Sequence, residues 1–360
     1  MKARLVQGSP PAEHAAIGDD RTSAAGAGSR AAGLAPRLAA GIRTRGVIVI
    51  WLALVAFFWA WAGPAFFTLN NARLVASDSA TTAIFSAALG FCVLAGALDL
   101  SVPGTAAVAG VVCAKLLASH APTAVAVAVA IGVGVLVGLV NAVLIEMGLN
   151  PLATTIGMLT VLSGIAALMS GDQPVLLSAA GNLNWLGNNR YLTIPAPVFA
   201  VAVIYLFGWL LLTKTFIGIR LLAVGGNADG ARRTGLRTPA YRMLGFVMSG
   251  ACAAIGGIVV AALISGASPA PDTNELFQAL TAVALSGIAL SGGRGSFPRI
   301  LFGALIITTL NSGLIIHGMA PAWATFATGA LLVGALAFDR GTAKVLGIAR
   351  FRGASSRRSG

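Results

Sequence analysis

The sequence predicts an all-α polytopic membrane protein with about ten transmembrane helices. Of its 360 residues, 57% are hydrophobic and only 10% are charged, whereas about a quarter of the residues in a soluble domain carry a charge. The apolar residues also gather into runs of roughly 20, the length that a helix needs to cross the hydrocarbon core. Because the basic residues lie between these runs, the pattern excludes a soluble globular fold.

Ten apolar segments define the expected helices, and the last two come from one uninterrupted run. That run covers residues 300–338 and is too long for a single crossing, and Gly318-Met319-Ala320-Pro321 within it is typical of a turn. In the third segment, Lys115 is expected to extend toward the interface or to face protein. The expected helices are residues 46–67, 80–98, 104–120, 122–146, 152–170, 195–213, 243–265, 275–291, 300–317 and 321–338.

The basic residues test this count independently, because the cytoplasmic loops of membrane proteins are enriched in lysine and arginine. With both termini in the cytoplasm, Arg73 and Arg190 fall outside and Lys115 falls within a helix, so the other 21 of the 24 basic residues lie inside. A missed helix would destroy this bias. The net charge of +13 therefore reflects orientation and contact with anionic membrane lipid, and no nucleic-acid partner is expected.

The chain divides into three regions by composition. Residues 1–45 are rich in Ala, Gly, Pro, Arg and Ser and are predicted to be a disordered basic cytoplasmic tail. Residues 46–338 form the expected transmembrane domain, which contains one large cytoplasmic loop at residues 214–242. Residues 339–360 are predicted to be a second basic cytoplasmic tail.

One sequence pattern occurs twice, 170 residues apart. Residues 141–151 and 311–321 share Asn, Leu, Ile, Gly and Pro at the same spacing, and each copy is followed by a threonine, Thr155 or Thr325. An offset of five helices reverses the orientation of a segment in the membrane. We therefore interpret the pair as a five-helix inverted repeat, a feature of transporters that alternate access to a central site. Chance matching among apolar residues and glycines is the alternative.

Glycines are expected to bring helices close together, because apolar burial cannot drive helix association in lipid. The sequence has 45 glycines. General helix packing is the role that we expect for them. The candidates for close contacts are Gly132, Gly134 and Gly138 in one segment, and Gly250, Gly256 and Gly257 in another.

Ionisable side chains at membrane depth are costly and mark candidate functional positions. Glu146 and Glu275 lie near the expected interfaces, where water solvates them. Asp99 comes shortly before Pro103-Gly104, which interrupts helical structure, and a broken helix at depth lies only against protein or a water-filled cavity. Asp99 therefore either lines a pathway or caps the third helix with its carboxylate. Both interpretations stay open.

The 214–242 loop has the capping signals of a short helix. Asn227 is expected to cap its start, Arg232 and Arg233 to occupy its last turn, and Gly235 to end it. A capped helix on the cytoplasmic face suits docking to a partner. A simple connector with orienting arginines is the alternative.

No signature of an enzyme is apparent in the sequence. The phosphate-binding pattern Gly-x-x-x-x-Gly-Lys-Ser/Thr does not occur, and no paired catalytic carboxylates or nucleophile elbow stand out. We expect no enzymatic activity, no metal and no cofactor in this chain. If ATP powers its activity, a separate chain must bind the ATP.

Several stretches, in this order and on the expected sides of the helices, resemble the ribose-type inner-membrane permeases of bacterial ABC importers. Singly each is weak, but together they are specific. The resemblance covers roughly residues 60–340. The matching stretches are residues 66–71 (Phe-Phe-Thr-Leu-Asn-Asn), 98–102 (Leu-Asp-Leu-Ser-Val), 223–227 (Ala-Val-Gly-Gly-Asn) with Ala231-Arg232 and Gly235, 290–295 (Leu-Ser-Gly-Gly-Arg-Gly), 303–306 (Gly-Ala-Leu-Ile) and 310–314 (Leu-Asn-Ser-Gly-Leu).

The resemblance implies a permease subunit that imports a monosaccharide or a similar polyhydroxylated solute across the bacterial inner (plasma) membrane by alternating access. It implies three partners: cytoplasmic ATPase subunits, a periplasmic or lipid-anchored solute-binding protein, and a second permease copy. Coupling to the ATPase is then assigned to Gly226, Asn227, Ala231, Arg232 and Gly235. The residues that we predict for the translocation path are Asp99, Ser101, Asn141 and Thr155.

The sequence also departs from this family, which leaves other functions open. Pro103 stands where the family usually has Gly, and Gln278 stands where it usually has a carboxylate, so ribose itself is not implied. An ion-coupled secondary transporter is one alternative, with Asp99 as the carboxylate that titrates. A permease of the same superfamily for nucleosides, amino acids or a signalling molecule is another.

Overall fold

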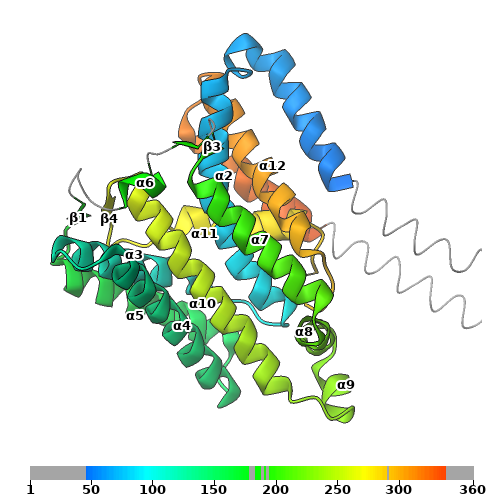
Figure 1. Ribbon diagram of the computed structural model, residues 1–360. Coiled ribbons are helices and arrows are strands. Elements are labelled where there is room, and N and C mark those ends of the chain that lie inside the picture. The colour runs from blue at the N-terminus through cyan, green and yellow to red at the C-terminus, as the bar shows by residue number, and fades with distance from the viewer. Residues whose placement is uncertain (1–45, 178–182, 188–189, 192–193, 290–291, 338–360) are drawn as a thin grey trace, which may run out of the picture. The chain divides into compact units, whose positions relative to one another are not determined.

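The computed structural model describes residues 46–177, 183–187, 190–191, 194–289 and 292–337. The two predicted tails, residues 1–45 and 339–360, lie outside these ranges. The described residues belong to one compact unit, which is built from long helices joined mostly by short connections (Figure 1).

Each of the ten expected helices has a counterpart among the described residues, which confirms the predicted all-α polytopic fold. Seven of them are long and apolar enough to cross a membrane. The ten helices are Gly46–Ala65, α2 (Leu69–Leu94), α3 (Val102–Ala118), α4 (Thr123–Glu146), α5 (Pro151–Ser170), α7 (Pro197–Lys214), α10 (Thr238–Leu263), α11 (Thr273–Leu285), α12 (Phe297–Ile316) and Pro321–Ala337. The shorter elements are η1 (Gly63–Ala65), β1 (Val175–Leu176), α6 (Asn184–Gly187), β2 (Arg190–Tyr191), β3 (Ile194–Pro195), α8 (Phe216–Gly226), α9 (Ala228–Arg233) and β4 (Gly266–Ala267).

α2 begins at Leu69, well before its predicted start at residue 80. Thr68 caps it, because its hydroxyl oxygen accepts a hydrogen bond from the Asn71 amide at 3.1 Å. The later part of α2 is buried by other helices. Its first residues, 69–78, are mostly exposed or half-buried and include Asn70, Arg73 and Asp78, so an apolar pattern does not extend over them. Arg73, predicted to lie in an outer loop, is therefore part of α2.

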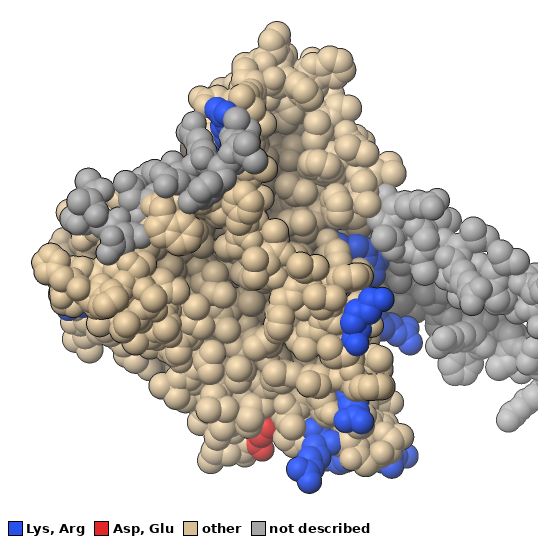
Figure 2. Space-filling model, viewed as in Figure 1, with Lys and Arg blue, Asp and Glu red and all other residues tan. Residues whose placement is uncertain are grey.

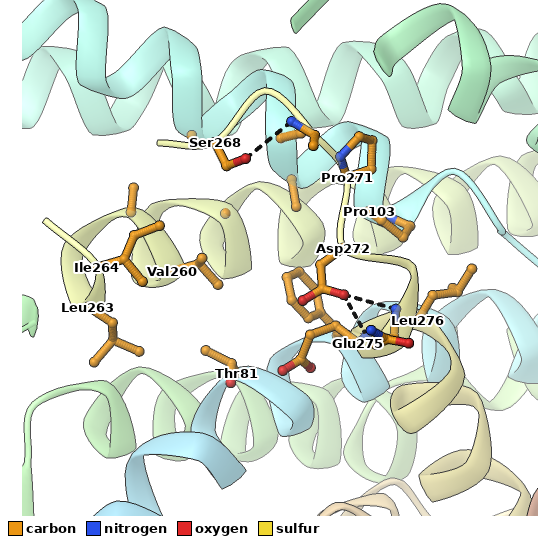
Figure 3. A pocket seen from close by; sticks show the side chains of 18 of the residues that line it. Thr81, Pro103, Val260, Leu263, Ile264, Ser268, Pro271, Asp272, Glu275 and Leu276 are labelled. Atoms are coloured by element: carbon orange, nitrogen blue, oxygen red, sulfur yellow. Dashed lines mark hydrogen bonds between the residues drawn. The ribbon is translucent and has the colours of Figure 1, made fainter. Parts of the chain in front are cut away.

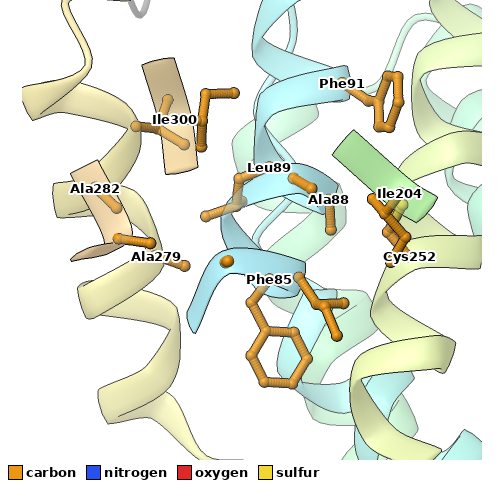
Figure 4. Packing of buried hydrophobic residues seen from close by; sticks show 14 of the residues in the cluster. Phe85, Ala88, Leu89, Phe91, Ile204, Cys252, Ala279, Ala282 and Ile300 are labelled. Carbon is orange, nitrogen blue, oxygen red and sulfur yellow. The ribbon is translucent and has the colours of Figure 1, made fainter. Parts of the chain in front are cut away.

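α2 is the centre of a hydrophobic cluster that includes residues of α7, α10, α11 and α12. Figure 4 shows Leu89 of α2 facing α11 and α12, and Phe91 on the side of α7 and α10. The ring of Phe297 lies between those of Phe91 and Tyr205, with centroids 4.5 and 5.1 Å away. Packing around α2 therefore holds the other helices in place.

Glycines bring α4 and α10 into backbone contact, as predicted. A Cβ atom on Gly134 would overlap the Gly250 backbone and would lie 2.6 Å from the Ala254 Cβ. Gly132 differs, because no neighbouring atom lies within 4 Å of its Cβ position; its predicted packing role is wrong, since it is on an exposed face of α4. The other candidate glycines also meet close neighbours: Gly138 meets Phe246, Gly256 meets Phe85 and Gly257 meets Ala106.

The two copies of the repeated sequence pattern have the same local structure. The connections at residues 147–150 and 317–320 each contain a glycine with positive φ, 103° at Gly148 and 84° at Gly318, and each is followed by a helix that starts at proline. The same three amide-to-carbonyl hydrogen bonds close both connections. They are Met147 to Val143 (2.9 Å), Gly148 to Ile145 (3.0 Å) and Leu149 to Leu144 (3.3 Å), matched by His317 to Gly313 (3.1 Å), Gly318 to Ile315 (2.9 Å) and Met319 to Leu314 (3.0 Å).

These two connections lie at opposite ends of the helices. Glu146 forms an ion pair of 3.8 Å with Arg242 at the start of α10. Ser312, near the second connection, donates a hydrogen bond to Asn71 at the start of α2 at 2.8 Å. α2 and α10 run antiparallel, so their starts lie at opposite ends, as an inverted repeat requires. The contacts that fix this direction are Phe85 with Gly256 and Ala95 with Gly245.

Candidate functional site

A cavity of about 820 Å³ lies between α2, α3, α10, α11 and the segment that joins α10 to α11. Figure 3 shows part of its wall, which combines apolar side chains such as Val260 and Leu276 with polar ones such as Asp272 and Glu275. None of the described residues that line it is a lysine, an arginine or a histidine. An apolar wall with a few polar groups is typical of small-molecule sites. The polar lining residues are Ser77, Asp78, Thr81, Ser268, Asp272, Thr273, Asn274 and Glu275.

The start of α11 fixes two carboxylates at this cavity. Asp272 caps the helix, because its Oδ1 atom accepts hydrogen bonds from the amides of Asn274 at 2.9 Å and Glu275 at 3.3 Å (Figure 3). The Oε2 atom of Glu275 accepts a hydrogen bond from the Thr82 hydroxyl of α2 at 3.3 Å. The positive end of the helix dipole stabilises negative charge at both positions.

Sequence reasoning missed the acidic residues of the cavity. Glu275 is predicted to be solvated at an interface and Asp78 to lie in an outer loop, but both line the cavity. For Asp78 the reason is the early start of α2, which makes this exposed residue part of the helix. The spacing of Asp78 and Thr82, four residues apart on one helix face, is the signal that could have indicated a polar face on α2.

Three of the four predicted path residues meet in one buried cluster. The carboxylate of Asp99, which is 1% exposed, accepts hydrogen bonds from the amide and the hydroxyl of Ser101 at 3.0 and 2.6 Å. The side-chain amide of Asn141 donates to the Ser101 hydroxyl at 2.8 Å. Ser249 of α10, which the sequence did not indicate, donates to the other carboxylate oxygen of Asp99 at 2.8 Å. The cluster thus joins the start of α3 to α4 and α10.

Asp99 binds the residue directly before α3, although no described side chain caps the helix itself. The amide that it binds belongs to Ser101, the residue directly before α3. Asp99, Ser101 and Asn141 are not among the residues that line the cavity, although Val102 and Pro103 of α3 are. The cluster therefore lies behind the cavity wall and supports it.

Thr155 lies apart from the other three predicted path residues. It is fully buried in α5, and its hydroxyl donates hydrogen bonds to the carbonyl oxygens of Pro151 and Leu152 at 3.0 and 3.3 Å. Both acceptors are in the first turn of the same helix. Thr155 belongs neither to the Asp99 cluster nor to the lining of the cavity.

The predicted short helix in the 214–242 loop exists as α9, directly after α8. Asn227 caps it by accepting a hydrogen bond from the Gly230 amide at 2.9 Å, and Gly235, with a φ of 83°, follows its end. Ala231 is buried, whereas Arg232 is exposed. Gly226 ends α8, so all five residues predicted for docking lie in one continuous segment. Figure 2 shows lysine and arginine side chains gathered at the end of the molecule where Figure 1 places α8 and α9.

A protein-family model described as "Branched-chain amino acid transport system / permease component" matches residues 71–336. The chain belongs to this family. It is therefore a multi-pass membrane protein and a transport permease component, not an enzyme, and the resemblance to sugar-type ABC permeases is confirmed by its relatives. No solved structure matches the chain.

Three similar proteins of Escherichia coli (strain K12) cover most of the chain. The ribose import permease protein RbsC is 29% identical over 71% of this chain and 81% of its own length. The galactofuranose transporter permease protein YtfT is 32% identical over 75% of this chain and 82% of its own length. The D-allose transport system permease protein AlsC is 29% identical over 82% of this chain and 91% of its own length.

Proposed function

We propose that this chain is the membrane-spanning subunit of an ABC importer that brings a monosaccharide or a similar polyhydroxylated solute into the cell. The observation that carries the proposal is the similarity, over most of the chain, to permeases named for ribose, galactofuranose and allose. The cavity supports it, because carboxylate and hydroxyl oxygens bind sugar hydroxyls well. The carboxylate of an amino acid would meet no lysine, arginine or histidine among the described residues of this wall.

The power for transport comes from ATPase subunits that dock on the α8–α9 segment. Arg232 and the exposed face of α9 contact acidic or carbonyl groups of the ATPase, while Gly226, Asn227, Ala231 and Gly235 shape the segment. ATP binds to that partner, so this chain needs no cofactor of its own. Both termini lie in the cytoplasm, in agreement with the distribution of basic residues.

Solute enters from the opposite side. A periplasmic or lipid-anchored binding protein releases it into the cavity. When access alternates, the path continues toward the cytoplasm along the wall that Asp99, Ser101 and Asn141 support from behind, and beside the helix that carries Thr155. A second copy of the chain completes the permease. Membrane lipid covers exposed apolar side chains such as those of α4, α5 and α7.

Reconstituted vesicles test this proposal against ion-coupled transport, which would use Asp99 as its titrating carboxylate. The permease, its ATPase and its binding protein are assembled in liposomes, and uptake of radiolabelled ribose, allose and galactose is measured with ATP at the ATPase side. We expect uptake of at least one sugar that requires ATP and persists with a protonophore. Uptake that does not depend on ATP and that stops when the ion gradient is removed would establish ion-coupled transport.

A further inference from the structure

Three segments meet at the end of α2 with no room for side chains between them. A Cβ atom on Gly225 of α8 would overlap the carbonyl oxygen of Leu94, and one on Gly292 would lie 2.7 Å from the Cα atom of Gly96. The Gly293 amide donates a hydrogen bond to the same Leu94 carbonyl oxygen at 3.3 Å. We call Gly96, Gly225, Gly292 and Gly293 the glycine joint. Because close-packed backbones transmit displacement, α8 cannot move without displacing the chain that follows α2.

The chain that follows α2 is a short non-helical link, residues 95–101, and both of its ends are held. The glycine joint holds its first end. The Asp99 cluster holds its second end, because Ser249 of α10 donates a hydrogen bond to Asp99 and Asn141 of α4 donates one to Ser101. Because only these few residues connect two fixed points, the link has little conformational freedom. A displacement at the joint therefore reaches the start of α3.

The start of α3 is also part of the cavity wall. Val102, Pro103 and Ala106, in its first turns, line the cavity. Their position depends on the cluster, because Asp99 fixes the amide directly before the helix. A shift of the link therefore changes the wall that a solute contacts. The α8–α9 segment, which contacts the first end of the link, is distant from this wall in the sequence.

The Asp99 cluster has an unused hydrogen-bonding group. The Oδ1 atom of Asn141 is buried and has no hydrogen-bond partner among the described residues, although the same side chain donates to Ser101. A buried acceptor without a donor is destabilising. A second arrangement of the link that offers Asn141 a donor would recover this energy, which is the property that a two-state element needs.

We propose that residues 95–101 transmit the movement of the α8–α9 segment to the cavity, and that Asp99 is the positioning residue that locks the link to α3 and α10. The inference rests on the proposed function, because the movement originates in the ATPase. Asp99 then acts through the backbone of α3 and does not touch the solute.

A cysteine reporter in the cavity tests this role directly. Ser268→Cys places an exposed thiol in the wall, whereas the native cysteines Cys92, Cys113 and Cys252 are buried. The permease is purified with its ATPase, and the labelling rate with a membrane-impermeant maleimide is measured with and without a non-hydrolysable ATP analogue. The rate of ATP hydrolysis is recorded in parallel as evidence that each complex is assembled.

Three variants are compared in this reporter background. Asp99→Asn and Ser249→Ala each weaken the lock between the link and its neighbours. Ser286→Ala is the matched control, because Ser286 is equally buried but its hydroxyl bonds the Val283 carbonyl of its own helix. We expect the nucleotide to change the labelling rate about fivefold in the parent and the control, the lower end of coupling between sites, and to change it little in the other two.

Each result decides between the proposals. If Asp99→Asn and Ser249→Ala respond to nucleotide as the parent does, the link does not carry the movement, although the proposed function stands. If the parent itself shows no response to nucleotide, the proposed function is contradicted and the inference falls with it. Loss of response in Ser249→Ala with normal ATP hydrolysis supports the inference even when Asp99→Asn does not assemble.

Discussion

The contact between α4 and α10 predicts different effects of the same substitution at two glycines of one helix. In Gly134→Ala the new methyl group overlaps the Gly250 backbone and lies 2.6 Å from the Ala254 Cβ. In Gly132→Ala the methyl group meets no atom within 4 Å. The two residues are half a turn apart on α4, so the comparison isolates packing.

The size of the difference follows from this geometry. Alanine gains up to about 1 kcal/mol over glycine in a helix, and this gain cancels between the two variants. Overpacking costs roughly 1–3 kcal/mol and applies only to Gly134→Ala, because backbone atoms of α10 cannot rotate away. Gly134→Ala is therefore expected to be less stable than Gly132→Ala by about 1–3 kcal/mol.

Unfolding of the purified protein in detergent measures this difference. Thermal or SDS-induced unfolding, followed by circular dichroism, should give Gly132→Ala a stability equal to or above that of the parent and Gly134→Ala a lower one. Equal stability of the two variants would show that α4 and α10 are not in backbone contact and would refute the packing argument.

Three predictions concern transport. Arg232→Glu should uncouple ATP hydrolysis from uptake while leaving the protein inserted in the membrane. The number of ATP molecules hydrolysed per solute imported measures coupling, and membrane fractionation measures insertion; normal uptake would argue against docking at α9. Asn227→Ala removes the α9 cap, worth about 0.5–2 kcal/mol, so uptake should fall while the thermal unfolding midpoint of the whole protein stays unchanged; a shifted midpoint would contradict a purely local role. Glu275→Ala should raise the apparent KM for the solute about tenfold, because it removes a hydrogen-bonding carboxyl group from the cavity wall, and an unchanged KM would place Glu275 outside the path.

Local sequence signals predicted the parts of this structure that depend on neighbouring residues. The turn at Gly318, the short helix capped by Asn227 and the approximate ends of α4 and α5 all follow from glycine, proline and capping residues close in sequence. The repeat became visible for the same reason, because both of its connections use one set of turn residues.

Features that depend on distant parts of the chain could not be predicted. Asp99 and Ser249 are 150 residues apart and meet only through the packing of α10 beside α3. The start of α2 was missed because its first residues, 69–78, include polar and charged side chains that interrupt the apolar run, and Asp78 was misplaced with it. Hydropathy reports the environment of lipid-facing helices, so it carries little information about a helix at the centre of the bundle.

The central claim is that a separate ATPase binds the α8–α9 segment on the cytoplasmic side of the membrane. Site-specific cross-linking tests it with two single-cysteine variants, Arg233→Cys on the exposed end of α9 and Ser268→Cys in the cavity wall. The account predicts that residue 233 cross-links to the ATPase in inside-out vesicles and stays unlabelled by an impermeant maleimide added to intact cells, while residue 268 shows the reverse. Labelling of residue 233 from outside, or cross-linking of the ATPase to residue 268, would contradict it.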